Sequence, residues 1–128
     1  MKGPIVITSE TLSADNKSRT ALFEGSVVAK TKDMTLYSDR MIVYYAEKTG
    51  NVTKIDAEGR VKLVRKDLIV TSKAANYFAE EEKIIFTGEP KAVERGNVVT
   101  GTKMTYLMKE DRSIVENSRV LLENKKEK

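Results

Sequence analysis

The sequence predicts an all-β fold in which repeated antiparallel hairpins form an open, folded-over roll or sandwich. Three observations predict it. Two kinds of short segment alternate along the chain at a step of about 30 residues, apolar and polar residues alternate at a period of two, and clusters of turn-forming residues separate the segments. Each hairpin is expected to add strands to two growing sheets whose inner faces oppose one another.

The first kind of segment consists of an apolar residue, Thr or Tyr, a small residue, two mostly polar residues and another apolar residue. The small residues are Ser9, Ser38, Ser72 and Gly101, in steps of 29, 34 and 29 residues. Apolar residues before and after the small residue fall on opposite parities of the chain. This change predicts a bend or bulge at which the inward face of the strand switches, although a strand that is apolar on both sides fits the pattern as well.

The second kind of segment alternates cleanly. Its small residues are Gly25, Gly59, Gly88 and Ser118, spaced by 34, 29 and 30 residues. Over residues 55–63 the odd positions are apolar or small and the even positions are all charged. This pattern indicates a strand with one buried face and one face in water, and the small residues are expected to leave room in the interior.

Polar clusters at the turns complete the outline of the domain. Those at 15–18, 47–51, 80–83 and 109–112 are expected on one edge of the roll, and those at 30–33, 65–67 and 94–97 on the other. The repeat predicts a single domain over residues 1–122. The charged run at 123–128 predicts a flexible tail.

Composition argues against several classes of function. The 128 residues include no Cys and no His, which excludes the usual zinc sites and Cys-His or Ser-His catalysis. Acidic residues lie mostly in turns or on the solvent side of strands, so we expect no enzyme, no cofactor and no metal. A net charge of +4 is too small to indicate nucleic-acid binding.

Two features of the sequence bear on location. No stretch of about 18 apolar residues predicts a membrane span. The start at residues 1–4 lacks the apolar core of a signal peptide. The protein is therefore either cytosolic, or periplasmic with a signal peptide that is not part of this sequence.

The series of segments resembles the OstA-like family. The resemblance extends from about Ile5 to Leu122, and its marks are the runs at 23–28, 86–89 and 101–107, although the repeats at 57–59 and 116–118 lack the aromatic residue. It implies a β-jelly roll that carries lipopolysaccharide through the periplasm between the inner and outer membranes. It also implies end-to-end stacking of copies, and inner- and outer-membrane transport components as partners.

The resemblance and the period-two pattern together predict an apolar interior that binds the acyl chains of lipid A. Each buried methylene group contributes about 0.8 kcal/mol, although any one of these residues also suits a plain β core. The predicted lipid-binding residues are Leu12, Phe23, Val27, Met41, Val43, Ile55, Val61, Leu63, Tyr77, Ile84, Phe86, Met104 and Tyr106.

Basic residues in the turns of one edge are candidates for contact with the phosphates of the lipid headgroup. They are Lys30, Lys32, Arg65, Lys66 and Arg95. Because Asp33, Asp67 and Glu94 lie beside them in the sequence, solvated turns are the alternative interpretation.

The terminal strands are candidate edges for association between copies. Pairing of the last strand, near 115–122, with the first, near 5–9, would form an open head-to-tail homo-oligomer. Two other functions fit the sequence: a structural β-repeat or interaction module, and the related periplasmic domain of another lipopolysaccharide-transport component.

Overall fold

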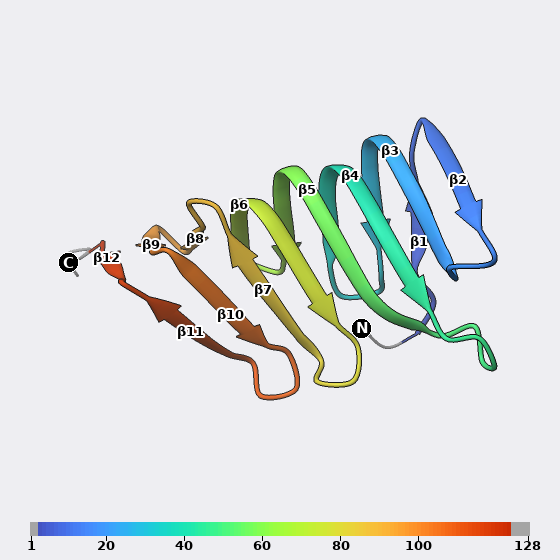
Figure 1. The fold of residues 1–128 in the computed structure, drawn as a ribbon. Helices are drawn as coiled ribbons and strands as arrows, with labels where there is room; N and C mark the ends of the chain where they lie inside the picture. The colour runs from blue at the N-terminus through green and yellow to red at the C-terminus, as the bar shows by residue number, and fades with distance from the viewer. Residues whose placement is uncertain (1–2, 124–128) are drawn as a thin grey trace.

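The computed structural model describes residues 3–123, and all regular structure among them is β-strand. Twelve strands, all paired antiparallel, form one open sheet that runs from β1 and β2 at one end to β11 and β12 at the other (Figure 1). The all-β prediction is therefore confirmed. The strands are β1 (Val6–Thr8), β2 (Thr11–Asp15), β3 (Thr20–Lys30), β4 (Thr35–Tyr45), β5 (Val52–Arg65), β6 (Leu68–Phe78), β7 (Lys83–Thr87), β8 (Lys91–Glu94), β9 (Asn97–Thr100), β10 (Lys103–Leu107), β11 (Arg112–Glu116) and β12 (Arg119–Leu121).

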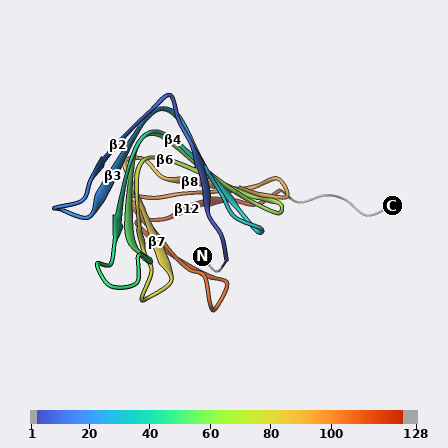
Figure 2. The same ribbon diagram turned by 90° about the vertical axis from the view of Figure 1, so that its right-hand side faces the viewer.

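The sheet is folded along one crease into two facing walls, as the view along its length shows (Figure 2). We call wall A the part formed by β1, β8, β9, β12 and the adjoining halves of β3 to β6. Wall B contains β2, β7, β10, β11 and the other halves of β3 to β6. The free tips of the walls face each other across an open side, which we call the mouth.

The crease arises from a repeated irregularity in the strands. Register shifts fall between Glu24 and Val27 in β3 and between Glu58 and Val61 in β5. At each, two successive residues have left-handed backbone: Gly25 (φ 86°) with Ser26, and Gly59 (φ 82°) with Arg60. Such bulges bend a strand sharply, so the long strands pass from one wall to the other here.

Serines of the first kind of segment lie at the same crease. The hydroxyl groups of Ser9, Ser38 and Ser72 each donate a hydrogen bond to the carbonyl two residues later, at 2.9, 3.1 and 2.9 Å. In the fourth repeat Gly101 replaces serine, and a Cβ there would lie 2.6 Å from the carbonyl oxygen of Glu116. The bend predicted at the small residues is thus confirmed.

The inward face of β4 changes parity at its bend. Leu36 and Ser38 are buried on even positions before it, and Met41 and Val43 on odd positions after it. The same change occurs in β6, where Val70 and Ser72 are followed by Ala75 and Tyr77. One interior face therefore continues around the corner, and a strand that is apolar on both sides is not needed to explain the pattern.

The glycines of the crease do not serve the interior, and the expectation that they leave room there is wrong. A Cβ on Gly59 would lie 2.5 Å from Oδ2 of Asp39, which is on the exposed side and paired with Arg60 at 2.6 Å. A Cβ on Gly25 would clash with the side chain of Glu10, and a Cβ on Gly88 with that of Lys73. Glycine is required by the left-handed backbone and by the close passage of an outer side chain.

The turns fall alternately on the two edges, as predicted. Those at 15–18, 47–51, 80–83 and 109–112 lie at the tips of wall B, and the other three at the tips of wall A. In the first of them Asp15 accepts hydrogen bonds from the backbone N–H of Lys17 and Ser18 at 2.9 and 3.3 Å. The bond from Ser18, and to a lesser extent that from Lys17, stabilises the ionised carboxylate and holds the pKa of Asp15 below its usual value.

The domain is predicted to end at residue 122, and Glu123 is the last residue that the structure describes. The backbone N–H of Glu123 donates a hydrogen bond to Oδ1 of Asn97, the first residue of β9, at 3.0 Å. The rest of the predicted tail, 124–128, lies outside the described residues.

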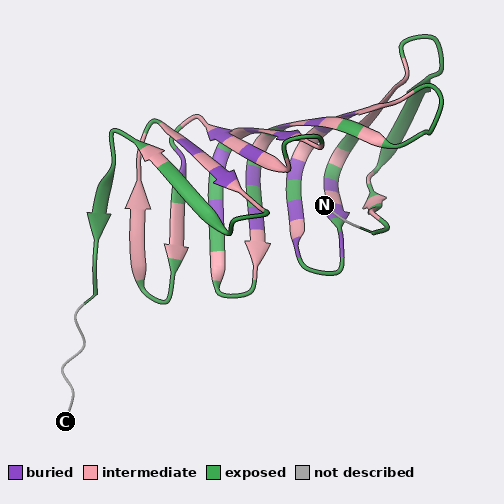
Figure 3. Ribbon diagram, turned by 90° about the horizontal axis from the view of Figure 1, so that it is seen from below, coloured by how far each residue is buried: buried purple, intermediate pink, exposed green. Residues whose placement is uncertain are grey.

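Cross-strand rows of apolar side chains form the core between the walls. In wall B the in-register row is Phe23, Met41, Ala57, Ala75, Phe86, Met104 and Val115. In wall A it is Ile7, Ala29, Leu36, Leu63, Val70, Ala92, Val99 and Val120. Burial is greatest in the middle strands and declines toward both ends (Figure 3).

Alanine at Gly59 is expected to destabilise the fold, because the new Cβ adds a clash with Asp39 to the cost of a left-handed φ. We expect the free energy of unfolding to fall by about 1–3 kcal/mol. Gly50→Ala is the matched control, since its φ is 71° but no atom lies within 4 Å of the added Cβ. Urea denaturation measures both, and equal losses would contradict this account of the crease.

Alanine at Met41 tests the packing of the centre. Met41 is fully buried, so Met41→Ala should lower the unfolding free energy by about 2–5 kcal/mol. Leu12 belongs to the same row but is 59% exposed, so Leu12→Ala should cost only about 0.5 kcal/mol. A small effect at Met41 in the same denaturation experiment would show that the centre is loosely packed.

Candidate functional site

The interior between the walls contains most of the side chains predicted to bind lipid. Eleven of the thirteen are buried: Val27, Met41, Val43, Ile55, Val61, Leu63, Tyr77, Ile84, Phe86, Met104 and Tyr106. Phe23 is half-buried and packs against this cluster. Leu12, on the edge strand β2, pairs with Phe23 of β3 and is mostly exposed, because no strand among residues 3–123 lies beyond β2.

A cavity of about 300 Å³ opens between the walls near β11 and β12. Three of the predicted residues, Phe86, Met104 and Tyr106, line it together. Most of the other predicted side chains lie in the tightly packed middle of the interior. In this conformation the interior is therefore filled at its centre and hollow toward its C-terminal end.

Several side chains that line this cavity were not predicted as site residues. They are Leu68, Val70, Ala92, Val99, Val115 and, at the rim, Leu122. Val70 and Val99 occupy the apolar position before the small residue of the first kind of segment, and Ala92 continues the odd parity of the second kind. The repeat thus contained the signal, but only the fold shows that wall A faces the same space as wall B.

The opposite part of the mouth is covered by the start of the chain. Gly3 and Ile5 border a groove shared with Val52, Tyr77 and Ala79 of wall B, and Ile5 packs against the core. Burial, and secondarily the negative charge of Glu82, raises the pKa of Tyr77 above its usual value. The phenol of Tyr77 is therefore neutral at physiological pH, as an apolar surrounding requires.

A polar cluster joins the walls beside the cavity. Arg65, at the end of β5 in wall A, donates a hydrogen bond from Nη1 to the hydroxyl of Tyr106 in β10 of wall B. Its guanidinium lies 5.6 Å from the centre of the Tyr106 ring, and Nη1 is 3.5 Å from Oδ1 of Asp111. The Tyr106 hydroxyl in turn donates to Asp111 at 2.7 Å. Arg65 therefore spans the mouth.

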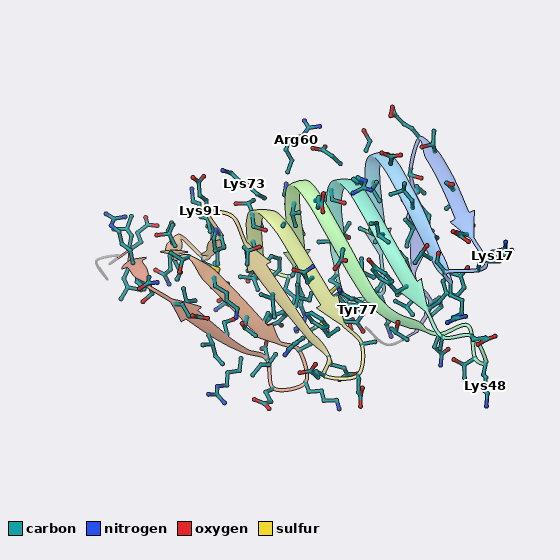
Figure 4. All side chains as sticks on the ribbon, in the orientation of Figure 1. Lys17, Lys48, Arg60, Lys73, Tyr77 and Lys91 are labelled. Atoms are coloured by element: carbon teal, nitrogen blue, oxygen red, sulfur yellow. The ribbon has the colours of Figure 1, made fainter. Side chains whose placement is uncertain are left out.

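The other basic residues predicted to contact headgroups have a different setting. Lys30, Lys32, Lys66 and Arg95 are exposed at the tips of wall A, and Arg95 pairs with Asp67 at 3.1 Å. Of the five, only Arg65 is drawn into the interior. On the outside, Arg60, Lys73 and Lys91 project away from the interior, whereas Tyr77 lies between the walls (Figure 4).

Neither a metal centre nor a membrane helix is found in residues 3–123. No group of three or more His, Cys, Asp or Glu side chains in that range is placed to hold a metal ion. Over the same range, no helix has the length and apolar character needed to cross a bilayer.

Comparison with known proteins adds to these observations. A family model described as "LptA/(LptD N-terminal domain) LPS transport protein" matches residues 6–112. Among solved structures, LptH, described as the LptA-homologous periplasmic component of the lipopolysaccharide transport device of Pseudomonas aeruginosa, superposes with a TM-score of 0.85. The two sequences are 15% identical, and the match covers 94% of this chain and 96% of LptH. A search of curated proteins finds no match.

The structural likeness shows that the fold is the LptA-like β-jelly roll, as the resemblance implied. The family match reaches from β1 to the first residue of β11 and so includes both walls and most of the crease. The chain therefore belongs to the LptA and LptD N-terminal-domain family of lipopolysaccharide transport proteins.

Proposed function

We propose that the protein is a non-enzymatic carrier in the periplasm that binds the acyl chains of lipid A between its two walls. By end-to-end assembly it bridges the inner and outer membranes. The observation that supports this most is the pair of apolar rows that line facing walls along the whole sheet. A globular domain needs only one closed core, whereas this interior is unclosed at its ends.

Acyl chains suit the chemistry of these rows. Wall B presents Phe23, Met41, Phe86 and Met104 without any charged side chain in the row, and each methylene removed from water contributes about 0.8 kcal/mol. Methionine has an unbranched, adaptable side chain that can repack around a flexible ligand. Part of this gain in binding free energy offsets the loss of the side-chain packing that fills the interior when no lipid is bound.

The size of the cavity limits what the closed form can hold. A dry cavity of about 150 Å³ accommodates benzene, so about 300 Å³ has room for part of one chain. Binding of several acyl chains therefore requires the walls to separate. The crease, where the backbone pairing is interrupted, is the natural hinge.

Exposed aliphatic side chains gather at the two ends of the sheet and support end-to-end assembly. Val6 and Leu12 are 63% and 59% exposed at one end, and Val120 and Leu121 are 50% and 56% exposed at the other. Within residues 3–123, the edge strands β2 and β11 each pair with one strand, β3 and β10 respectively. Pairing of β11 with β2 of a second copy would continue the row of Val115 into Leu12 and give one uninterrupted interior.

The same edges suit the partners expected in such a bridge, namely related domains of the inner- and outer-membrane transport components. The basic side chains at the tips of wall A, Lys30, Lys32, Lys66 and Arg95, are proposed to meet the phosphates of the headgroup, which would remain outside the mouth.

A second candidate function follows from the family description, which also includes the N-terminal domain of LptD. In that case the chain is the periplasmic domain of another transport component.

Photo-crosslinking from inward positions tests lipid binding. A photoreactive residue at Phe86 or Met104 should label purified lipopolysaccharide strongly, because both line the cavity. The matched outward positions Glu58 and Lys62 are exposed and should label it at least about tenfold less. Equal labelling from both faces would contradict an interior site, and no labelling at all would favour a structural module.

Sedimentation tests the assembly. The protein should show concentration-dependent, open-ended association in analytical ultracentrifugation, and Leu12→Lys should weaken it at least about tenfold because it places a charge in the joint. Ile69→Lys is the control, since Ile69 is 37% exposed on β6, away from both ends. A wild-type protein that stays monomeric at high concentration would contradict the assembly.

A further inference from the structure

The contact of Arg65 with Tyr106 and Asp111 joins strands that are not neighbours in the sheet. β5 and β10 are separated by β6 and β7, so this contact crosses the interior. It lies at the mouth, and Tyr106 is also part of the wall of the 300 Å³ cavity. Separation of the walls next to the cavity must therefore break it.

The hydrogen bonds of Arg65 are incompletely satisfied. Its side chain is 22% exposed, and its Nε is buried with no hydrogen-bond acceptor among the described residues. Nη1 bonds to the Tyr106 hydroxyl and faces Asp111. A buried donor without a partner costs free energy. An anion that bonds Nε as well as Nη1 would therefore be a better partner for the guanidinium than Asp111.

Asp111 is a weak partner for this guanidinium. Its side chain is 80% exposed in the β10–β11 turn, and it lies 3.5 Å from Nη1 only. Ion pairs of this kind contribute little, because water screens them. A phosphate monoester has three terminal oxygens, two of which can bond Nε and an Nη together in the two-pronged geometry that arginine favours.

We propose that Arg65, Tyr106 and Asp111 form a latch that holds the walls closed beside the cavity, and that the phosphate of an amphiphile opens it by replacing Asp111 on Arg65. The phosphate also takes the Nη1 donor from the Tyr106 hydroxyl, so the hydrogen bond between the walls breaks and the apolar tail enters the cavity. This inference rests on the proposed carrier function. It makes Arg65 the residue that couples recognition of an anionic headgroup to opening of the interior.

Binding of simple amphiphiles tests the exchange. Monododecyl phosphate, tridecanoate and the uncharged dodecyl maltoside each carry the same twelve-carbon alkyl tail and are titrated below their micellar concentrations by calorimetry. Wild-type protein should prefer the phosphate to the maltoside at least about tenfold, with tridecanoate between them. Arg65→Met, which keeps the length of the side chain but not its charge, should abolish that preference.

Asp111→Asn provides a second variant at an exposed position and remains informative should Arg65→Met not fold. It removes the competing carboxylate and should raise the affinity for monododecyl phosphate about threefold to tenfold. Asp67→Asn is the matched control, because Asp67 follows Arg65 in the β5–β6 turn but pairs with Arg95 of the β8–β9 turn. Its affinities should equal those of the wild type.

A distance measurement reports opening directly. The chain has no Cys, so Lys66→Cys and Glu110→Cys place spin labels on exposed turns of wall A and wall B without interference. Electron–electron resonance should give one distance in the empty protein and a longer one with monododecyl phosphate. Asp111→Asn should shift part of the population toward the longer distance without ligand, and Asp67→Asn should not.

The outcomes separate the latch from the carrier function. A phosphate preference that survives in Arg65→Met, or a label distance unchanged by monododecyl phosphate, overturns the latch even where lipopolysaccharide still crosslinks to Met104. Absence of both amphiphile binding and crosslinking in the wild type overturns the carrier function, and the latch with it.

Discussion

The left-handed bend at Gly25–Ser26, Gly59–Arg60 and Gly88–Glu89 is the constraint on which the architecture depends. A single antiparallel sheet of this width has no partner sheet to cover its apolar face, and the crease solves this by folding the sheet onto itself. Gly59 and Arg60 show why the sequence is specific there: both have positive φ, and Asp39 passes so close that a side chain on Gly59 has no room. Without the crease, the rows of Met41 and Leu63 would face water instead of each other.

Closure by folding has a different consequence from closure by a barrel. A barrel joins its first and last strands, whereas this sheet keeps two free ends and one open mouth. The free ends retain exposed aliphatic side chains, among them Leu12 and Val120, which a lone domain would be expected to replace with charged residues. The open ends and the long apolar interior thus follow from the same geometry.

Different parts of the interior stabilise the fold and provide room for a ligand. Its centre, around Met41, Ile55 and Leu63, is as buried as the core of any small protein, and this packing holds the ligand-free protein together. Toward β11 a cavity lies between the walls. In that part of the mouth, the walls are joined by the polar contact of Arg65 with Tyr106 and not by apolar packing. Polar links of this kind can be exchanged for others with little net cost, whereas the packed centre cannot be opened without a ligand to fill it.

The sequence by itself determined the repeat, the alternation of two strand types, the alternate placement of the turns, and the inward side of nearly every strand. These features depend on local rules, since side chains in a strand alternate faces and the first position of each left-handed bend has no room for a Cβ. The parity change at Ser38 located the bend in β4, and the run at residues 55–63 located the inner face of β5.

Only the tertiary structure decided which inward residues meet one another and which remain uncovered. Leu12 matches Met41 in pattern, yet it is exposed because no strand in the described part of the chain lies beyond β2. The basic residues Arg65, at the end of β5, and Lys66, in the turn that follows, are neighbours, but Arg65 alone spans the mouth to Tyr106, 41 positions away. Such differences depend on the distance between walls and on the position of a strand within the sheet. No local pattern encodes these quantities, because the fold of the whole chain sets them.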